Sequence, residues 1–144
     1  MKILETILNE KHILKVDPEL NYNKEQVRLF KIFINFCIDY LKIKGKFSTV
    51  LAAERGRYGI KTTAYYFDIQ KRLVVYSKGR MLGDIMRSIA HELTHKKQYE
   101  EDRIKDVEAD GADGSPIENE ANAMAGEIIR KFINTHEDGS KIFT

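Results

Sequence analysis

The residues with the clearest chemical potential in this chain are two histidines four positions apart, His91 and His95. Glu92 directly follows the first of them, so the segment reads H-E-x-x-H. Residues four apart in an α-helix lie on one face, where two imidazoles can bind one metal ion with the glutamate beside them. The first hypothesis for this segment is therefore a metal site on a helix.

Residues 82–99 have the apolar periodicity of an amphipathic helix. The apolar side is made of Leu82, Ile85, Met86, Ile89 and Leu93. His91 and His95 fall on the opposite side, together with polar residues such as Ser88 and Gln98. This placement argues against core histidines and leaves a pair of solvated surface histidines as the alternative to a metal site.

A third ligand is expected from a second helix, predicted at residues 116–133, because a catalytic zinc ion usually has three protein ligands and one water. Glu118 lies at the edge of the apolar face of this helix, where an unpaired charge is costly and a metal ion is a suitable partner. Asn122, one turn later, is expected to hydrogen-bond a ligand. Glu120 falls on the solvent side. The alternative is an ordinary amphipathic helix with one glutamate near its start.

The two segments together resemble a known family pattern. H-E-x-x-H followed by E-x-x-A-N, formed by Glu118, Ala121 and Asn122, is similar to the motif of glutamate-zincins, a group of small metallopeptidases that includes the ImmA/IrrE-type enzymes. The resemblance covers roughly residues 80–132. Metzincins and SprT-like proteases fit less well, because residues 96–101 contain no third histidine and Cys37 is the only cysteine.

The resemblance implies a zinc-dependent peptidase that acts on a protein or peptide. In such an enzyme His91, His95 and Glu118 would hold Zn²⁺. Glu92 would be the catalytic general base, taking a proton from a metal-activated water and passing it to the leaving amine. Asn122 would support the ligands without binding the metal.

The remaining elements predict an α+β fold in one domain, residues 1–144. A buried helix is predicted at residues 23–44, followed by strands at 47–53, 60–67 and 73–76. With the two later helices, this order matches a minimal zincin-like domain with an N-terminal helix, a small mainly antiparallel sheet, the H-E-x-x-H helix and a C-terminal ligand-bearing helix. The resemblance also implies that an edge strand binds the substrate as an added strand.

Several other residue groups carry weaker chemical signals. The candidate donors to an oxyanion are Tyr58, Tyr65, Tyr66, Tyr76 and Tyr99, all of which are more often packing residues. The acidic loop at residues 100–115 is similar to a calcium loop, but Ile117 stands where that loop needs a glutamate, so a solvated loop is predicted. Cys37 is predicted to be a buried, inert thiol. His136 is predicted to lie in a frayed terminal segment.

Composition and charge suggest two further functions. Residues 1–97 carry 19 Lys and Arg against 10 Asp and Glu, whereas residues 98–144 carry 5 against 12. The basic half could contact nucleic acid, although no nucleic-acid motif supports that. A nucleic-acid-associated protein and a catalytically inactive zincin-like binding or adaptor module are therefore the alternatives to a peptidase.

The sequence also bears on where the protein works. No apolar stretch is long enough to span a membrane, and the first residues lack the uninterrupted apolar region of a signal peptide. One cysteine excludes an internal disulfide and suits a reducing compartment. We expect a soluble, cytoplasmic protein without a membrane partner.

Overall fold

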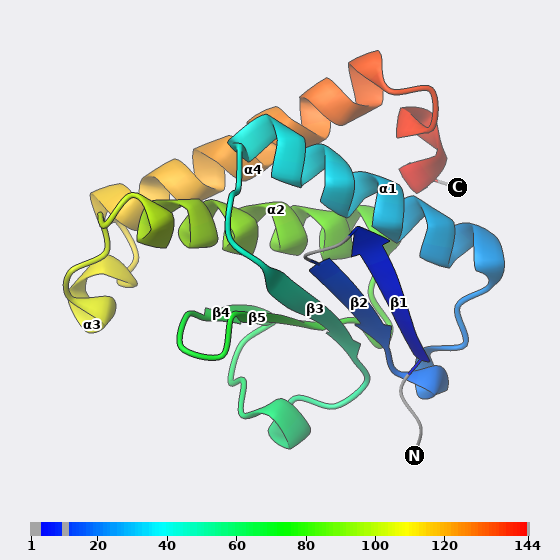
Figure 1. The fold of residues 1–144 in the computed structure, drawn as a ribbon, viewed down its shortest axis with the longest axis horizontal. Helices are drawn as coiled ribbons and strands as arrows, with labels where there is room; N and C mark the ends of the chain where they lie inside the picture. Colours follow the sequence, from blue (N-terminus) through cyan, green and yellow to red (C-terminus); the bar gives the residue numbers. More distant parts are fainter. Residues whose placement is uncertain (1–3, 10–11, 144) are drawn as a thin grey trace.

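The fold combines a sheet with a layer of helices. The computed structural model describes the backbone of residues 4–9 and 12–143 and the side chains of residues 12–141. In this part of the chain, three long helices lie over one face of a five-stranded sheet (Figure 1). The elements are β1 Leu4–Asn9, β2 His12–Val16, α1 Lys24–Leu41, β3 Phe47–Ala52, β4 Ala64–Phe67, β5 Arg72–Tyr76, α2 Leu82–Glu100, α3 Val107–Asp110 and α4 Pro116–Thr135. The predicted α+β class is confirmed.

The sheet is mixed, so the prediction of a mainly antiparallel sheet is wrong. Its strand order is β1-β2-β3-β5-β4. The outer pairings, β1 with β2 and β4 with β5, are antiparallel, whereas β3 is parallel to both β2 and β5. β2 and β3 run parallel because α1 carries the chain back between them, and parallel neighbours require such a crossover. The strand left at one edge is β4.

The fold opens with a hairpin rather than with the predicted N-terminal helix. β1 and β2 both precede α1. In β2, Leu14 and Val16 are buried in the core while Ile13 and Lys15 are half-buried, which is the alternation of a strand. Five residues with this alternation give a much weaker sequence signal than an 18-residue helix.

The helices follow the sequence pattern closely. α1 begins after Asn23, whose side chain accepts a hydrogen bond from the Gln26 backbone amide while the Gln26 side chain accepts one from Asn23. Cys37 is fully buried, and burial raises the pKa of its thiol, as expected of an inert residue. The predicted apolar face of α2 is also buried, with Ile89 and Leu93 fully enclosed. None of the described helices is long and apolar enough to cross a membrane.

The strand predicted at residues 60–67 is shorter in the structure. β4 starts only at Ala64, because the preceding segment forms a 3-10 turn, Gly56–Tyr58, and then crosses the sheet face opposite the helices. Ile60 packs there against Val50 and Val74. β4 is thereby left as a four-residue edge strand beside α2.

Candidate metal centre

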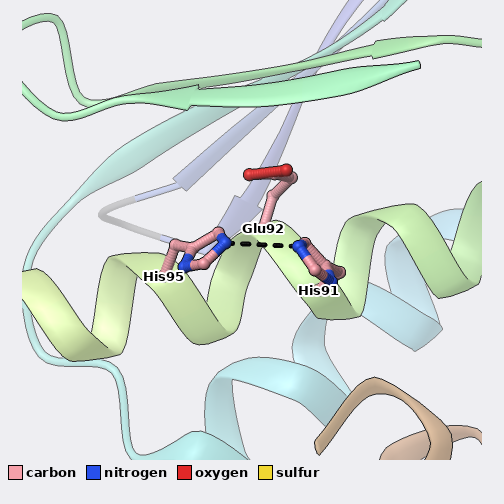
Figure 2. Close-up of side chains that lie close together, drawn as sticks. All are labelled: His91, Glu92 and His95. Atoms are coloured by element: carbon pink, nitrogen blue, oxygen red, sulfur yellow. Dashed lines mark hydrogen bonds between the residues drawn. The ribbon is translucent and has the colours of Figure 1, made fainter. Parts of the chain in front are cut away.

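α2 brings the two histidines of the motif together. The Nε2 atoms of His91 and His95 lie 3.2 Å apart on the side of the helix opposite its apolar face, and Figure 2 shows the two rings turned toward each other. Both side chains are largely enclosed, with exposed fractions of 17% and 14%. They are therefore not the freely solvated surface pair of the alternative interpretation.

α4 adds the carboxylate of Glu118 to the pair. One oxygen lies 2.7 Å from His91 Nε2 and the other lies 3.1 Å from His95 Nε2. Glu118 reaches this position because the Ser115 hydroxyl caps the helix by accepting a hydrogen bond from the Glu118 amide. α4 then runs back along α2 in the opposite direction (Figure 1). The three predicted ligands thus meet, although 23 positions separate Glu118 from His95.

The spacing of these three donors fits a small tetrahedral cation. Ligand bonds of about 2.0–2.1 Å at a tetrahedral zinc ion place its ligand atoms about 3.3 Å from one another. The three separations in this cluster are 2.7, 3.1 and 3.2 Å. Burial lowers the pKa of His91 even though the Glu118 charge opposes this. A neutral imidazole is the form that binds a metal ion.

A buried glutamine fixes the orientation of His95. His95 Nδ1 lies 2.7 Å from the Gln98 side-chain oxygen, and the Gln98 amide nitrogen donates to the Ile117 carbonyl and to Glu120. Since the Gln98 oxygen can only accept, this contact places a proton on His95 Nδ1, which makes Nε2 the ring atom available to a metal ion. Arg103 holds Glu120 through two hydrogen bonds of 2.8 Å.

The sequence pattern did not predict this chain of hydrogen bonds, which runs from His95 through Gln98 and Glu120 to Arg103. Its one sequence signal is that Gln98 follows His95 by three positions on the same polar face. Glu120, expected on the solvent side, is 39% exposed and paired with Arg103. Asn122 has its predicted position beside His91, where its hydrogen bond raises the pKa of the imidazole against the effect of burial.

The Glu92 side chain points from α2 toward the sheet (Figure 2). The contact between the two histidine rings lies on a different side of the helix. The Glu92 ligand oxygen and the donor atoms of His91 and His95 all lie within 4.8 Å of one another, so these three groups could also hold one metal ion. Only 8% of Glu92 is exposed. Burial, reinforced by the nearby Glu118 charge, raises its pKa to about 7, while His95 and a hydrogen bond from the Tyr66 backbone act in the opposite direction.

The free edge of β4 lies next to this carboxyl group. The Tyr76 amide donates to the Thr63 carbonyl, so Thr63 and Tyr65 form their ladder bonds with β5. Along an antiparallel strand, residues that hydrogen-bond the neighbouring strand alternate with residues that do not. The backbone N–H and C=O groups of Ala64 and Tyr66 therefore point away from β5, toward the open edge of the sheet. The hydrogen bond from Tyr66 to Glu92 uses one of these outward groups.

The donors and the strand edge border one cleft of about 500 Å³. Its walls are Thr62, Thr63, Ala64, Tyr65 and Tyr66 beside the strand edge, Arg87, Ser88, His91, Glu92, His95 and Tyr99 on α2, Ile104, Val107, Asp110, Gly111 and Asp113 on the segment that contains α3, and Ile117, Glu118 and Asn122 on α4. Three of these residues are aliphatic: Ile104, Val107 and Ile117. Residues that could ligate a metal, accept a proton and bind a peptide backbone therefore share a single cleft.

The other residues considered from the sequence fall into two groups. Tyr65, Tyr66 and Tyr99 line the cleft, whereas Tyr58 and Tyr76 pack on the far face of the sheet. In the acidic loop, two carboxylates accept hydrogen bonds from backbone amides of the loop itself. Asp106 caps α3, and Asp110 accepts hydrogen bonds from the backbone amides of Lys105 and Asp106. His136 stacks on Phe132, outside the residues that line the cleft.

Comparisons of the chain with models of protein families, with curated proteins and with solved structures found no match.

Proposed function

We propose that this chain is a zinc-dependent peptidase with the architecture of a minimal glutamate-zincin. The observation that carries the proposal is the meeting of His91, His95 and Glu118 in one cleft, with the buried Glu92 carboxyl beside them. Two imidazoles and one carboxylate form a donor set typical of catalytic zinc, whereas calcium and magnesium favour oxygen ligands. Zinc bound there would supply Lewis-acid chemistry, which acidifies a water molecule and polarises a carbonyl group.

Glu92 is the general base in this proposal. Its carboxyl points toward the strand edge and lines the cleft, whereas the Glu118 oxygens contact the Nε2 atoms of both histidines, so Glu118 is the ligand in this proposal. Glu92 takes the proton of the attacking water and delivers it to the leaving amine. Gln98 and Asn122 act only by holding the histidine rings in place.

The free edge of β4 positions the substrate. An extended peptide that adds to this edge would hydrogen-bond the outward backbone groups of Ala64, and its peptide bond would lie between β4 and α2. The neighbouring Glu92 carboxyl already bonds the outward amide of Tyr66, which fixes the base relative to the bound strand. The four-residue length of β4 limits this pairing to a few substrate residues.

The test is hydrolysis of a mixed-sequence peptide library by the zinc-loaded protein, with products identified by mass spectrometry. The native chain should cleave a subset of peptides, and Glu92→Gln should lower turnover by about 10²–10⁴-fold while keeping its zinc. Glu127→Ala, which removes a carboxylate of α4 outside the cleft, is the matched control and should behave like the native chain.

Two results would overturn the peptidase proposal. Full turnover by Glu92→Gln would remove the assigned base. Zinc-loaded native protein that binds peptides but cleaves none would indicate a binding or adaptor module built on the same site.

A further inference from the structure

The rows of residues by which α2 and α4 face each other continue beyond the metal ligands. The residues in each of these rows are spaced by four. The α2 series is His95, His91 and Arg87, and the α4 series is Glu118, Asn122, Gly126 and Arg130. α2 and α4 run in opposite directions (Figure 1). The position one turn before His91 on α2 therefore faces the position one turn after Asn122 on α4, and the Arg87 side chain reaches Gly126.

Two guanidinium groups converge at Gly126. A Cβ atom on this glycine would lie 3.4 Å from Arg130 Nη1 and 3.7 Å from Arg87 Nη1. Both groups therefore reach the same point above the helix, where the missing side chain leaves room. Arg87 also lines the cleft, one helical turn before His91.

Neither guanidinium is neutralised by the protein. Among the described side chains, Arg87 and Arg130 take part in no ion pair and no hydrogen bond, and both are exposed. Two other arginines are paired with carboxylates, Arg28 with Glu25 and Asp138 and Arg103 with Glu120. Two cations that approach each other without a counterion are mutually repulsive, and a carboxylate between them would accept charge-assisted hydrogen bonds of about 2.7–2.9 Å from both.

We propose that Arg87 and Arg130 form a carboxylate-binding subsite beside the Arg87 end of the cleft, with Gly126 as its floor. It would recognise a peptide through either a C-terminal carboxylate or an acidic side chain. Residues four apart on a helix are about 5–6 Å from each other, so the subsite lies within one or two substrate residues of the metal ligands. This inference rests on the proposed peptidase function, because a bound peptide is its ligand.

The test measures peptide retention on immobilised, zinc-loaded Glu92→Gln protein, which should hold peptides without cutting them. Three sets of short peptides serve as probes: a free C-terminal carboxylate without Asp or Glu, an amidated end with one Glu, and an amidated end without acidic residues. The first or the second set should be retained roughly tenfold more strongly than the third, and the set that is retained identifies the source of the carboxylate.

Substitutions then locate the preference. Arg87→Ala and Arg130→Ala should each reduce it several-fold, and Gly126→Asp should abolish it by placing a carboxylate of the protein between the two arginines. Lys131→Ala, a charge removed from the same helix beside Arg130, should leave it unchanged. Equal retention of the three sets, or a preference that survives both arginine substitutions, would overturn the subsite.

Zinc content measured on the same samples separates this inference from the proposed function. Protein that binds no zinc but retains carboxylate peptides through Arg87 and Arg130 would disprove the peptidase and keep the subsite. Protein that binds zinc and cleaves peptides without any such preference would do the reverse.

Discussion

Two polar clusters of this chain contrast in how their charges are satisfied. The cluster near the C-terminus joins α1 to the segment after α4. There Arg28 lies 2.8 Å from Glu25 and 2.9 Å from Asp138, and Lys141 lies 2.8 Å from Asp138. Every carboxylate faces a side chain that is cationic at neutral pH, so the cluster is complete without a ligand.

The cluster of His91, His95 and Glu118 contains no such cation. Its contacts of 2.7 and 3.1 Å join a carboxylate to imidazole nitrogens, and burial lowers the pKa of His91, which disfavours the imidazolium that would make an ion pair. Potential metal donors from three residues therefore meet in a cleft. The carboxylates of the C-terminal cluster are thus already paired with cations, whereas the histidine cluster has the donor set that the proposed zinc ion would complete.

Adding zinc should separate the two clusters most strongly. At a free zinc concentration about 1,000 times the Kd, the native chain should gain about 4 kcal/mol in its free energy of unfolding, which a rise in Tm measures. His95→Ala should lose most of this gain, and Asp138→Asn should keep it because the C-terminal cluster holds no zinc. An equal gain with calcium, or an equal gain in His95→Ala, would contradict the account.

The pH dependence of the metal-free protein should have opposite signs at Glu92, beside the histidine cluster, and at Asp138 of the C-terminal cluster. The pKa of Glu92 is raised from its ordinary value of 4.5 to about 7, so between these values the folded state holds a proton that the unfolded state has lost. Stability should therefore fall as pH rises through this window, by at most about 3 kcal/mol. Glu92→Gln should remove this pH dependence, measured by urea unfolding with a chelator present. If the stability of the variant falls with pH as steeply as that of the native chain, Glu92 is not its cause.

Loss of the Gln98 side chain should weaken the metal site without destroying it. Outer partners of ligand histidines contribute about 10–100-fold to metal affinity, and Gln98→Ala should reduce zinc affinity within that range in a competition titration with a chelator. Gln98→Glu keeps an acceptor for His95 but sets a carboxylate oxygen against the Ile117 carbonyl and Glu120, so it should not restore the affinity. Lys97→Ala, one position away, is the control, and an equal loss in this variant would show a general effect on α2.

The smallest expected effect belongs to the C-terminal cluster. Hydrogen bonds from Arg28 and Lys141 lower the pKa of Asp138 from 3.8 to about 2. This contribution to stability is present above the ordinary Asp range and is lost as pH falls toward 2. Asp138→Asn should lower the Tm modestly at neutral pH and much less at pH 2, with Glu137→Gln as a neighbour that changes neither. A loss of Tm that is the same at both values would exclude the ion pairs as its cause.

The features of the fold and the candidate site that the sequence predicts are those that depend on residues close together in the chain. The positions of His91, His95 and Cys37 follow from helical periodicity within one element, and the buried face of α2 and the start of α1 after Asn23 agree with that periodicity. Glu118 could be selected because an inward carboxylate near a helix start needs a partner.

Features that depend on how distant elements meet were missed. β1 and β2 are short, and the parallel pairing of β2 with β3 appears only when α1 is placed between them. The contact of Gln98 with Glu120 and the convergence of Arg87 on Gly126 depend on the approach of α4 to α2, which no periodicity within one helix encodes.

The most direct test of the central claim is the zinc content of the purified chain after loading and dialysis, measured by elemental analysis. The account predicts close to one zinc ion per chain in the native protein, the same in Glu127→Ala, and little in Glu118→Ala. A native chain that retains no zinc, or a Glu118→Ala variant that retains as much as the native chain, would contradict the His91, His95 and Glu118 site.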